Sequence, residues 1–289
     1  MQKVMITGIA GGFGKPTALA LLEKGYKVAG SVRNREGKNA DTVAELAAAG
    51  ASIVELDVTD TDSTERGVAE AIAHLGGIDV LFNNAGVRSY GIQELMSPED
   101  MARVFDVNVM GVQRVMRAAL PHMRAQGRGT GLYTSSLIGR IATPFYGTYS
   151  ASKWALEAIV ECYRTELSGF GIESCIIEPG AMPTAFFDGM VVSKDPDREA
   201  QYGEFAAVPT MSAAGLAEML NATPDQRPER IAEAVVALLD KPFGQKPFRT
   251  VVDHVGIGPQ IERYNDVLHD VTRNVMTSFG IEEMLKLNA

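Results

Sequence analysis

Residues 3–24, KVMITGIAGGFGKPTALALLEK, decide the fold of this chain because they place a strand, a glycine-rich turn and a helix in immediate succession. The apolar run Lys3 to Thr7 predicts a short strand, and the apolar spacing from Phe13 to Lys24 predicts a helix. Glycines in the turn let the backbone bend tightly and approach a pyrophosphate, which then lies at the positive end of the helix. The turn contains Gly8, Gly12 and Gly14. A lone glycine motif is weak evidence, but at the start of a βαβ unit it predicts dinucleotide binding.

The end of the second predicted strand indicates which dinucleotide is bound. In dinucleotide-binding folds an acidic residue at this point binds the ribose 2′-hydroxyl, whereas a nearby Arg accommodates a 2′-phosphate. The run Lys27 to Val32 contains no Asp or Glu at its end and is followed directly by Arg33, and Lys15 adds a second cation. We therefore predict NADP(H) as the preferred cofactor and NAD(H) as the alternative. A solvated surface charge is the competing interpretation of Arg33.

Residues 133–153, YTSSLIGRIATPFYGTYSASK, contain the candidate catalytic groups. Positions i and i+4 share one face of a helix, so the ammonium of Lys153 is expected beneath the phenol of Tyr149. A nearby cation favours the phenolate and so lowers the pKa of the phenol. Ser136, at a strand end, can return to the same point and donate a hydrogen bond to a substrate oxygen. The Tyr-x-x-x-Lys pair alone is a weak signal, and chance is the alternative.

Taken together, these motifs resemble the short-chain dehydrogenase/reductase family, and among its members the hydroxysteroid, retinol and carbonyl-reductase types. The resemblance covers about Lys3 to Asp253. It is carried by Thr7-Gly8-x-x-x-Gly12-x-Gly14, Asn83-Asn84-Ala85-Gly86, Asn108, Ser136, Tyr149-x-x-x-Lys153 and Pro179-Gly180. It implies reversible hydride transfer between a nicotinamide cofactor and a carbonyl/alcohol pair.

The resemblance also implies the roles of individual residues. As catalytic residues it implies Asn108, Ser136, Tyr149 and Lys153, with Asn108 holding a water that links Lys153 to solvent. Asp57 would contact the adenine edge, and Thr184 would reach the carboxamide or a phosphate of the cofactor. The implied cofactor site consists of Gly8, Gly12, Phe13, Gly14, Arg33, Asp57, Val58, Asn84, Ala85, Gly86, Tyr149, Lys153, Pro179, Gly180 and Thr184.

The predicted elements alternate between strand and helix, which favours one doubly wound parallel sheet of about seven strands in an α/β (Rossmann) domain. Strands are predicted at Lys3–Thr7, Lys27–Val32, Ser52–Leu56, Val80–Asn83, Thr130–Ser135, Glu173–Glu178 and Phe248–Val252. Helices are predicted at Phe13–Lys24, Asn39–Ala49, Thr61–His74, Pro98–Arg124, Ser150–Ser168, Pro228–Leu239 and Pro259–Ser278. We expect a catalytic domain over residues 1–255 and a helical extension over 256–289, packed on the same domain.

Composition excludes several classes of partner. Apolar residues make up 46% of the 289 residues and the net charge is −9, which argues against nucleic acid and anionic membrane. No apolar run approaches the ~20 residues that span a bilayer. Cys162 and Cys175 lack metal-ligand spacing, so we predict two buried thiols and no metal. The N-terminus runs directly into a strand pattern, so we expect a cytoplasmic protein.

Residues 185–221 predict a substrate lid, because Phe and Met lie there among Asp, Gly and Pro in a long irregular or weakly helical insertion. Arg88 is expected on the outer rim of the pocket, so a hydrophobic ketone, aldehyde or alcohol is the predicted substrate. The predicted substrate pocket comprises Ser136, Phe145, Phe186, Phe187 and Met190.

Two other functions stay open at this point. One is a non-catalytic regulator that senses the cofactor, although such proteins usually lack the Tyr or the Lys. The other is an epimerase or lyase of the same fold that acts on a nucleotide sugar with bound NAD. We further expect a homodimer or homotetramer that pairs the helices predicted at Pro98–Arg124 and Ser150–Ser168 across a two-fold axis.

Overall fold

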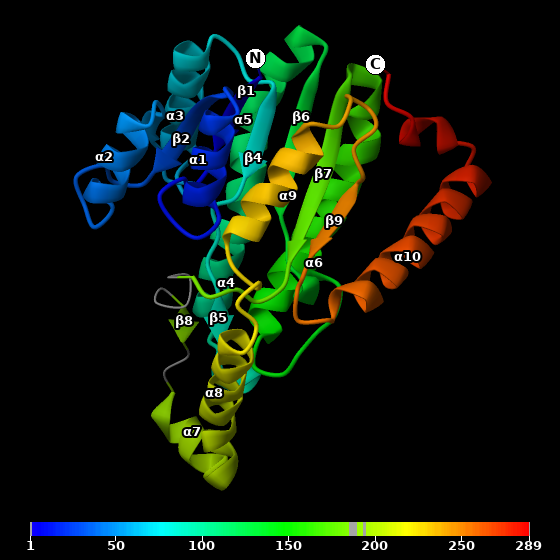
Figure 1. Cartoon of the computed structure of the whole chain (residues 1–289). Helices are drawn as coiled ribbons and strands as arrows, with labels where there is room; N and C mark the ends of the chain where they lie inside the picture. The colour runs from blue at the N-terminus through cyan, green and yellow to red at the C-terminus, as the bar shows by residue number, and fades with distance from the viewer. Residues whose placement is uncertain (1, 185–189, 193–194, 289) are drawn as a thin grey trace.

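A parallel sheet of seven strands forms the centre of the computed structural model, which describes residues 2–184, 190–192 and 195–288 (Figure 1). The strands lie in the order β3-β2-β1-β4-β6-β7-β9, and all of their pairings are parallel. They are β1 (Lys3–Ile6), β2 (Lys27–Val32), β3 (Ser52–Glu55), β4 (Val80–Asn83), β6 (Gly129–Thr134), β7 (Ile172–Pro179) and β9 (Arg249–Val252). The strand order reverses between β1 and β4. In open α/β sheets this is the point at which ligands bind, beyond the carboxyl ends of the strands.

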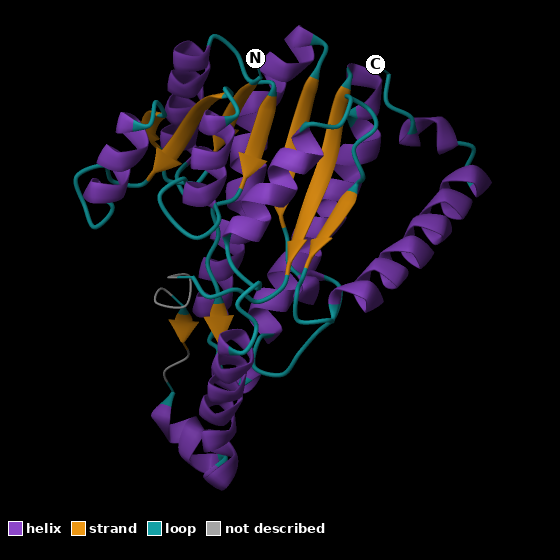
Figure 2. Ribbon diagram, in the orientation of Figure 1, coloured by secondary structure: helices purple, strands orange, loops and turns teal. Residues whose placement is uncertain are grey.

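Helices cover both faces of the sheet (Figure 2). The helices that flank it are α1 (Gly14–Glu23), α2 (Ala40–Ala48), α3 (Thr61–Leu75), α5 (Gly111–Gln126), α6 (Gly147–Glu166) and α9 (Glu229–Leu239). The others are α4 (Pro98–Phe105), α7 (Pro196–Gln201), α8 (Val208–Asn221) and α10 (Gly258–Ser278). The doubly wound α/β fold predicted from the sequence is therefore confirmed.

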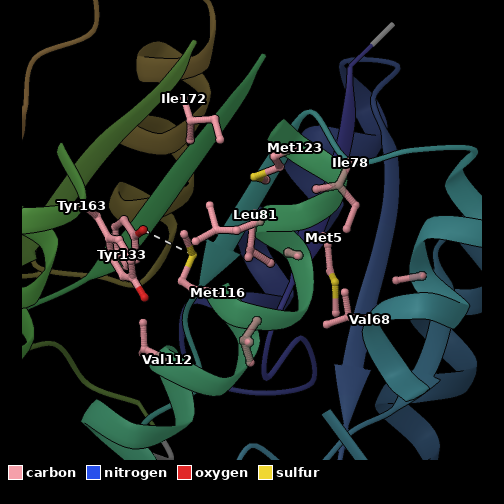
Figure 3. Close-up of a cluster of buried hydrophobic side chains, with 14 of the residues drawn as sticks. Met5, Val68, Ile78, Leu81, Val112, Met116, Met123, Tyr133, Tyr163 and Ile172 are labelled. Carbon is pink, nitrogen blue, oxygen red and sulfur yellow. Dashed lines mark hydrogen bonds between the residues drawn. The ribbon is translucent and has the colours of Figure 1, made fainter. Parts of the chain in front are cut away.

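Alternation along the strands divides the core into two layers, because successive side chains of a strand point to opposite faces. On β1, Met5 packs in the layer beneath α3, α5 and α6, whereas Val4 and Ile6 pack in the layer beneath α1, α2 and α9. In the first layer the Tyr133 hydroxyl donates to the Met116 sulfur at 3.3 Å, and the Tyr133 ring stacks on Tyr163 (Figure 3). Because buried apolar side chains fill both layers, they fix the strand ends and so the positions of the residues that follow them.

Two glycines are required by close packing next to the first turn. A Cβ added to Gly14 would lie 2.4 Å from the carbonyl oxygen of Gly8, and one added to Gly30 would lie 2.1 Å from the Cδ1 of Ile9. Gly8 and Gly12 have φ of 67° and 49°, in the left-handed region that favours glycine. The glycine pattern in the sequence thus corresponds to a real backbone constraint.

The structure departs from the predicted helices at two places. The helix predicted over Pro98–Arg124 is interrupted by a π-helical turn at Asp106–Met110, between α4 and α5. Helix α6 begins at Gly147 rather than Ser150, since the Ser150 N–H already donates to the Tyr146 carbonyl at 2.8 Å. Tyr149 therefore lies inside the first turn of α6, where a helix fixes its direction.

The insertion before α9 is more regular than predicted. Its described part forms the strand β8 (Val191–Val192), which pairs with β5 (Ser89–Tyr90), followed by α7 and α8. These two helices project past the carboxyl ends of the sheet strands (Figure 1). We call residues 190–221 without 193 and 194 the lid.

The structure also bears on the predictions about the two cysteines and about membrane-spanning segments. Cys175 is buried as predicted, but Cys162 is exposed on α6, so the prediction of two buried thiols is wrong for Cys162. Cys162 lies at the edge of a small cavity between α6 and α10, so its side chain stays open to solvent. Within the described residues, no helix is long and apolar enough to cross a membrane.

Candidate active site

Three predicted catalytic residues meet at the carboxyl end of β6. Ser136 follows this strand in extended conformation, and its hydroxyl donates to the Pro179 carbonyl at 3.5 Å. Tyr149 and Lys153 lie one turn apart on α6, with the Lys153 Nζ 5.7 Å from the centre of the Tyr149 ring. The Lys153 ammonium donates to the Thr134 carbonyl at 2.8 Å, which ties α6 to the end of β6.

Burial governs the ionisation of these groups. It raises the pKa of Tyr149, which the positive charge of Arg88 and a hydrogen bond from Ser136 partly offset. Burial lowers the pKa of Lys153 to about 8, against the opposing attraction of Glu157. Since a Lys with this pKa loses its proton at mildly alkaline pH, its charge is not fixed over the range in which a phenol titrates. A phenol and a hydroxyl in this arrangement can exchange a proton with a substrate oxygen.

Asn108 lies at the π-helical turn and connects three elements. Its Oδ1 accepts from the Val87 N–H at 2.8 Å, and its Nδ2 donates to the Val87 carbonyl at 2.9 Å and to the Ser152 hydroxyl at 3.0 Å. Both amide hydrogens are thus used within the protein. These contacts hold the chain after β4 against α6, a positioning role that is separate from the predicted water-holding role.

The residues after β4 enclose the glycine turn. The Thr7 hydroxyl accepts from the backbone N–H of Asn84 and of Ala85, each at 3.0 Å. The Asn84 side chain donates to the carbonyls of Thr7 and Gly8 at 3.1 and 3.2 Å, so it holds the turn together rather than reaching outward. A Cβ on Gly86 would lie 3.2 Å from the Asn108 Oδ1 and 3.8 Å from the Lys153 Nζ. Gly86 therefore borders two of the predicted catalytic residues, Asn108 and Lys153.

The start of α1 fits a pyrophosphate. Among the described residues, none caps this helix with its side chain, and the first turn of the helix contains no acidic residue. Phe13 precedes the helix, and a Cβ on Gly12 would meet no atom within 4 Å. Open backbone N–H groups at the positive end of a helix are the donors that an anionic group requires. The first glycine turn thus suits the diphosphate of a dinucleotide.

The predicted cations Lys15 and Arg33, and the neighbouring Arg35, differ in their surroundings. Lys15 pairs with Glu45 at 2.7 Å and Arg35 pairs with Glu70 at 2.9 Å. Arg33 is exposed at the end of β2 and makes no ion pair with any residue that the structure describes. Its guanidinium is available to an incoming phosphate.

Asp57 and Val58 follow β3 on the same side of the sheet. The Asp57 Oδ1 accepts from the backbone N–H and the hydroxyl of Thr59, at 2.9 and 2.8 Å. The Val58 carbonyl accepts from the Arg114 guanidinium at 3.0 Å. The loop after β3 is therefore fixed, with Asp57 half-buried beside it.

The loop after β7 is held by a residue that the sequence did not single out. Gln226 is buried, and its side chain donates to the Ala181 carbonyl at 2.8 Å and accepts from the His254 N–H at 2.6 Å. A Cβ on Gly180 would lie 2.6 Å from the Gln226 Nε2, so a glycine is needed for the loop to lie this close to Gln226. Thr184 follows, half-buried. No short-range sequence signal marks a Gln that acts across 45 residues.

The predicted substrate wall is present in part. Phe145 has φ of 69°, a strained backbone for a non-glycine residue, and its ring lies 6.0 Å from Tyr90 and 6.2 Å from Phe205 of the lid. Met190 is half-buried just before β8. Phe186 and Phe187 lie outside the described residues.

The prediction that Arg88 lies on the outer rim is wrong. Its side chain is 8% exposed, and its guanidinium carbon lies 5.2 Å from the centre of the Tyr146 ring and 5.8 Å from that of Tyr149. The pairing of β5 with β8 covers this segment, and no sequence pattern predicts two strands of only two residues each.

The comparisons with known proteins agree with this geometry. Residues 2–193 match the family model described as short chain dehydrogenase. A 3-ketodihydrosphingosine reductase from Bacteroides thetaiotaomicron is 35% identical over 203 residues, which cover 70% of this chain and 72% of the relative. An NADPH-dependent 3-dehydrocapnine reductase from Ornithobacterium rhinotracheale is 32% identical over 213 residues, covering 72% of this chain and 75% of the relative.

A solved structure extends the likeness to nearly the whole chain. It is a short-chain dehydrogenase from Streptomyces avermitilis, with a TM-score of 0.76 and 28% identity, covering 97% of this chain and 99% of that one. Both the matched sequence and the matched fold include the residues around Ser136, Tyr149 and Lys153. The chain belongs to the short-chain dehydrogenase family, oxidoreductases that act on alcohol and carbonyl groups with a nicotinamide cofactor.

Proposed function

We propose that this protein interconverts a hydrophobic ketone or aldehyde and its alcohol with NADP(H), using Tyr149 as the general acid and base. The observation that carries the proposal is the meeting of Ser136, Tyr149 and Lys153 at one strand end, next to Gly86. A bound nicotinamide cofactor supplies or accepts the hydride.

Each residue has a separate task in this proposal. Ser136 donates a hydrogen bond to the substrate oxygen, and Tyr149 gives its proton to that oxygen in reduction or takes it in oxidation. Lys153 hydrogen-bonds the nicotinamide ribose and favours the phenolate while it is charged. Asn108 keeps the chain after β4 at the correct distance from α6.

Two other functions remain alternatives. A cofactor-sensing regulator has no need of a buried Tyr-Lys pair with a hydroxyl beside it. An epimerase or lyase of the same fold retains its NAD, and the exposed cation Arg33 favours an exchangeable NADP(H) instead. The relative named as NADPH-dependent supports the same choice.

Cofactor preference gives a first test. We expect Arg33→Ala to reduce the preference for NADP(H) over NAD(H) about ten- to a hundred-fold, because one charge-assisted contact contributes roughly 1.5–3 kcal/mol. The measurement is kcat/KM for both cofactors, with Arg35→Ala as the matched control, since Arg35 is already paired with Glu70. A wild-type enzyme that uses both cofactors equally well contradicts the assignment.

Substrate class gives a second test. The aromatic contacts of Phe145 with Tyr90 and Phe205 support a pocket with apolar walls. Burying a further ~100 Å² of apolar surface is worth about 2.5 kcal/mol, so kcat/KM for a bulky aromatic ketone should exceed that for a small keto acid by well over tenfold. A clear advantage for the keto acid overturns this choice of substrate.

We further propose that the protein forms a homodimer or homotetramer through α5 and α6. The outward face of α6 supports the pairing, because all its exposed residues except Glu166 are small or apolar: Ala151, Trp154, Ala158 and Cys162. Closed two-fold symmetry is the commonest arrangement of such faces.

A further inference from the structure

Arg88 is a second cation at the catalytic tyrosine. The side chain is buried, and its guanidinium carbon lies 5.8 Å from the Tyr149 ring centre, about as far as the Lys153 ammonium at 5.7 Å. The two cations approach from different elements, Lys153 from α6 and Arg88 from the segment between β4 and β5. Tyr149 thus has one positive charge from its own helix and one from outside it.

The two cations differ in whether they keep their positive charge at alkaline pH. An Arg guanidinium does not lose its proton under conditions in which proteins stay folded. Burial lowers the pKa of Lys153 to about 8, and the Arg88 charge lowers the pKa of Tyr149 against the effect of burial. Over the alkaline range in which a phenol ionises, Arg88 is therefore the cation that stays charged.

The position of Arg88 is fixed by the lid. The Val191 N–H of β8 donates to the Arg88 carbonyl at 2.8 Å, and Ser89 pairs with Val191 in the small sheet. The neighbouring Tyr90 hydroxyl donates to the Pro209 carbonyl of α8 at 2.7 Å. Two contacts with the lid thus hold the segment that presents the guanidinium to Tyr149.

We propose that Arg88 is a positioning residue whose permanent charge stabilises the phenolate form of Tyr149 during proton transfer. The charge acts through Tyr149, so the inference rests on the proposed acid–base role of that residue. The ionisable groups that face Tyr149 from the described elements are Arg88, Lys153 and Tyr146, with the Ser136 hydroxyl as a hydrogen-bond partner. Of these, Arg88 is the one whose charge lowers the pKa of Tyr149, whereas Tyr146 raises it. Because β8 holds Arg88, the acid strength of Tyr149 depends on the lid being in place.

The test is the pH dependence of the oxidation of a neutral hydrophobic alcohol. In oxidation Tyr149 acts as the base, so kcat rises with pH as the phenolate forms. Removing a charge about 6 Å away, at an effective dielectric constant near 20, should move this rising limb up by roughly one pH unit or more. We expect the shift in Arg88→Met and Arg88→Gln, and its rescue in Arg88→Lys. Arg103→Met, which removes an exposed Arg, is the matched control and should leave the profile unchanged.

A second readout needs no turnover. The ultraviolet absorption of tyrosinate is followed against pH in the wild type and in Tyr149→Phe, and the difference isolates the ionisation of Tyr149. We expect the same difference in the Arg88→Met background to appear at higher pH. This titration tests the role of Arg88 even if none of the alcohols is oxidised. The absence of oxidation would then count against the proposed substrate and not against the role of Arg88.

Two results overturn the proposal. One is a rising limb and a tyrosinate titration that stay at the wild-type pH in Arg88→Met and Arg88→Gln. The other is an unmoved profile combined with a selective loss of activity on keto acids, which makes Arg88 a receptor for a substrate anion instead.

Discussion

Replacing Tyr149 by Phe is expected to reduce turnover by ~10²–10⁴-fold, because general acid–base catalysis contributes about this factor. The change removes one oxygen atom and keeps the ring, which lies buried in the first turn of α6. The substrate oxygen then loses the phenol that exchanges its proton, although the Ser136 hydroxyl remains, and the glycine turn and the start of α1 are untouched. Binding of NADPH should therefore stay close to that of the wild type.

The measurement combines steady-state kinetics with cofactor binding by fluorescence. Tyr264→Phe is the matched control, since Tyr264 is a partly exposed tyrosine on α10 and should keep full activity. Near-wild-type turnover in Tyr149→Phe would reject the acid–base role. Loss of NADPH binding together with turnover would indicate damage to the site rather than loss of a proton donor.

The second large effect is expected on stability, from Arg249→Met. Arg249 lies on β9 and pairs with three carboxylates, Glu157 at 2.9 Å, Glu178 at 3.5 Å, and Glu161. Glu157 and Glu178 are almost fully buried, so removing the cation leaves buried charge without its main partner. Breaking a buried pair in this way typically costs about 3–5 kcal/mol of unfolding free energy.

The pH dependence of this cost follows from Glu178. Burial, together with the neighbouring Glu157, raises its pKa well above the ordinary value, and Arg249 opposes this shift. A carboxyl with a raised folded-state pKa stabilises the fold at low pH, and this stabilisation is lost as the pH rises through that pKa. Without Arg249 the loss is larger, so the destabilisation should be greater above neutral pH than at mildly acidic pH.

Denaturant unfolding at two pH values measures both effects. Arg103→Met is again the control, because its exposed pair with Asp100 should contribute less than about 1 kcal/mol. Equal stability of Arg249→Met and the control would mean that the ion pairs of Arg249 with Glu157, Glu161 and Glu178 do not stabilise the packing of β9 against α6.

Local sequence patterns account for most of the sheet. Strands β2 and β4 begin and end at the predicted residues, since each is a buried run bounded by polar or turn residues. The glycine turn was also predictable, because only residues without a Cβ fit where α1 crosses close to the end of β1. These features depend on residues that are near one another in the sequence.

The features that the sequence did not reveal depend on distant partners. The π-helical turn forms where Asn108 bonds the backbone of Val87, 21 residues earlier. Arg88 is covered where Val191, 103 residues later in the sequence, pairs with its segment. Arg249 and Glu157 are separated by 92 residues. No periodicity or motif encodes such contacts, so the electrostatics around Tyr149 became visible only in the folded chain.

Consumption of NADPH with a panel of hydrophobic ketones and aldehydes, coupled to identification of the alcohol formed, tests the central claim most directly. The account predicts that the wild type forms one alcohol for each NADPH consumed and that Tyr149→Phe forms almost none. A wild-type protein that binds NADPH but does not consume it with any carbonyl compound of the panel would contradict the account and favour a cofactor-sensing regulator. Purification with tightly held NAD that does not exchange would contradict it in favour of an epimerase or lyase.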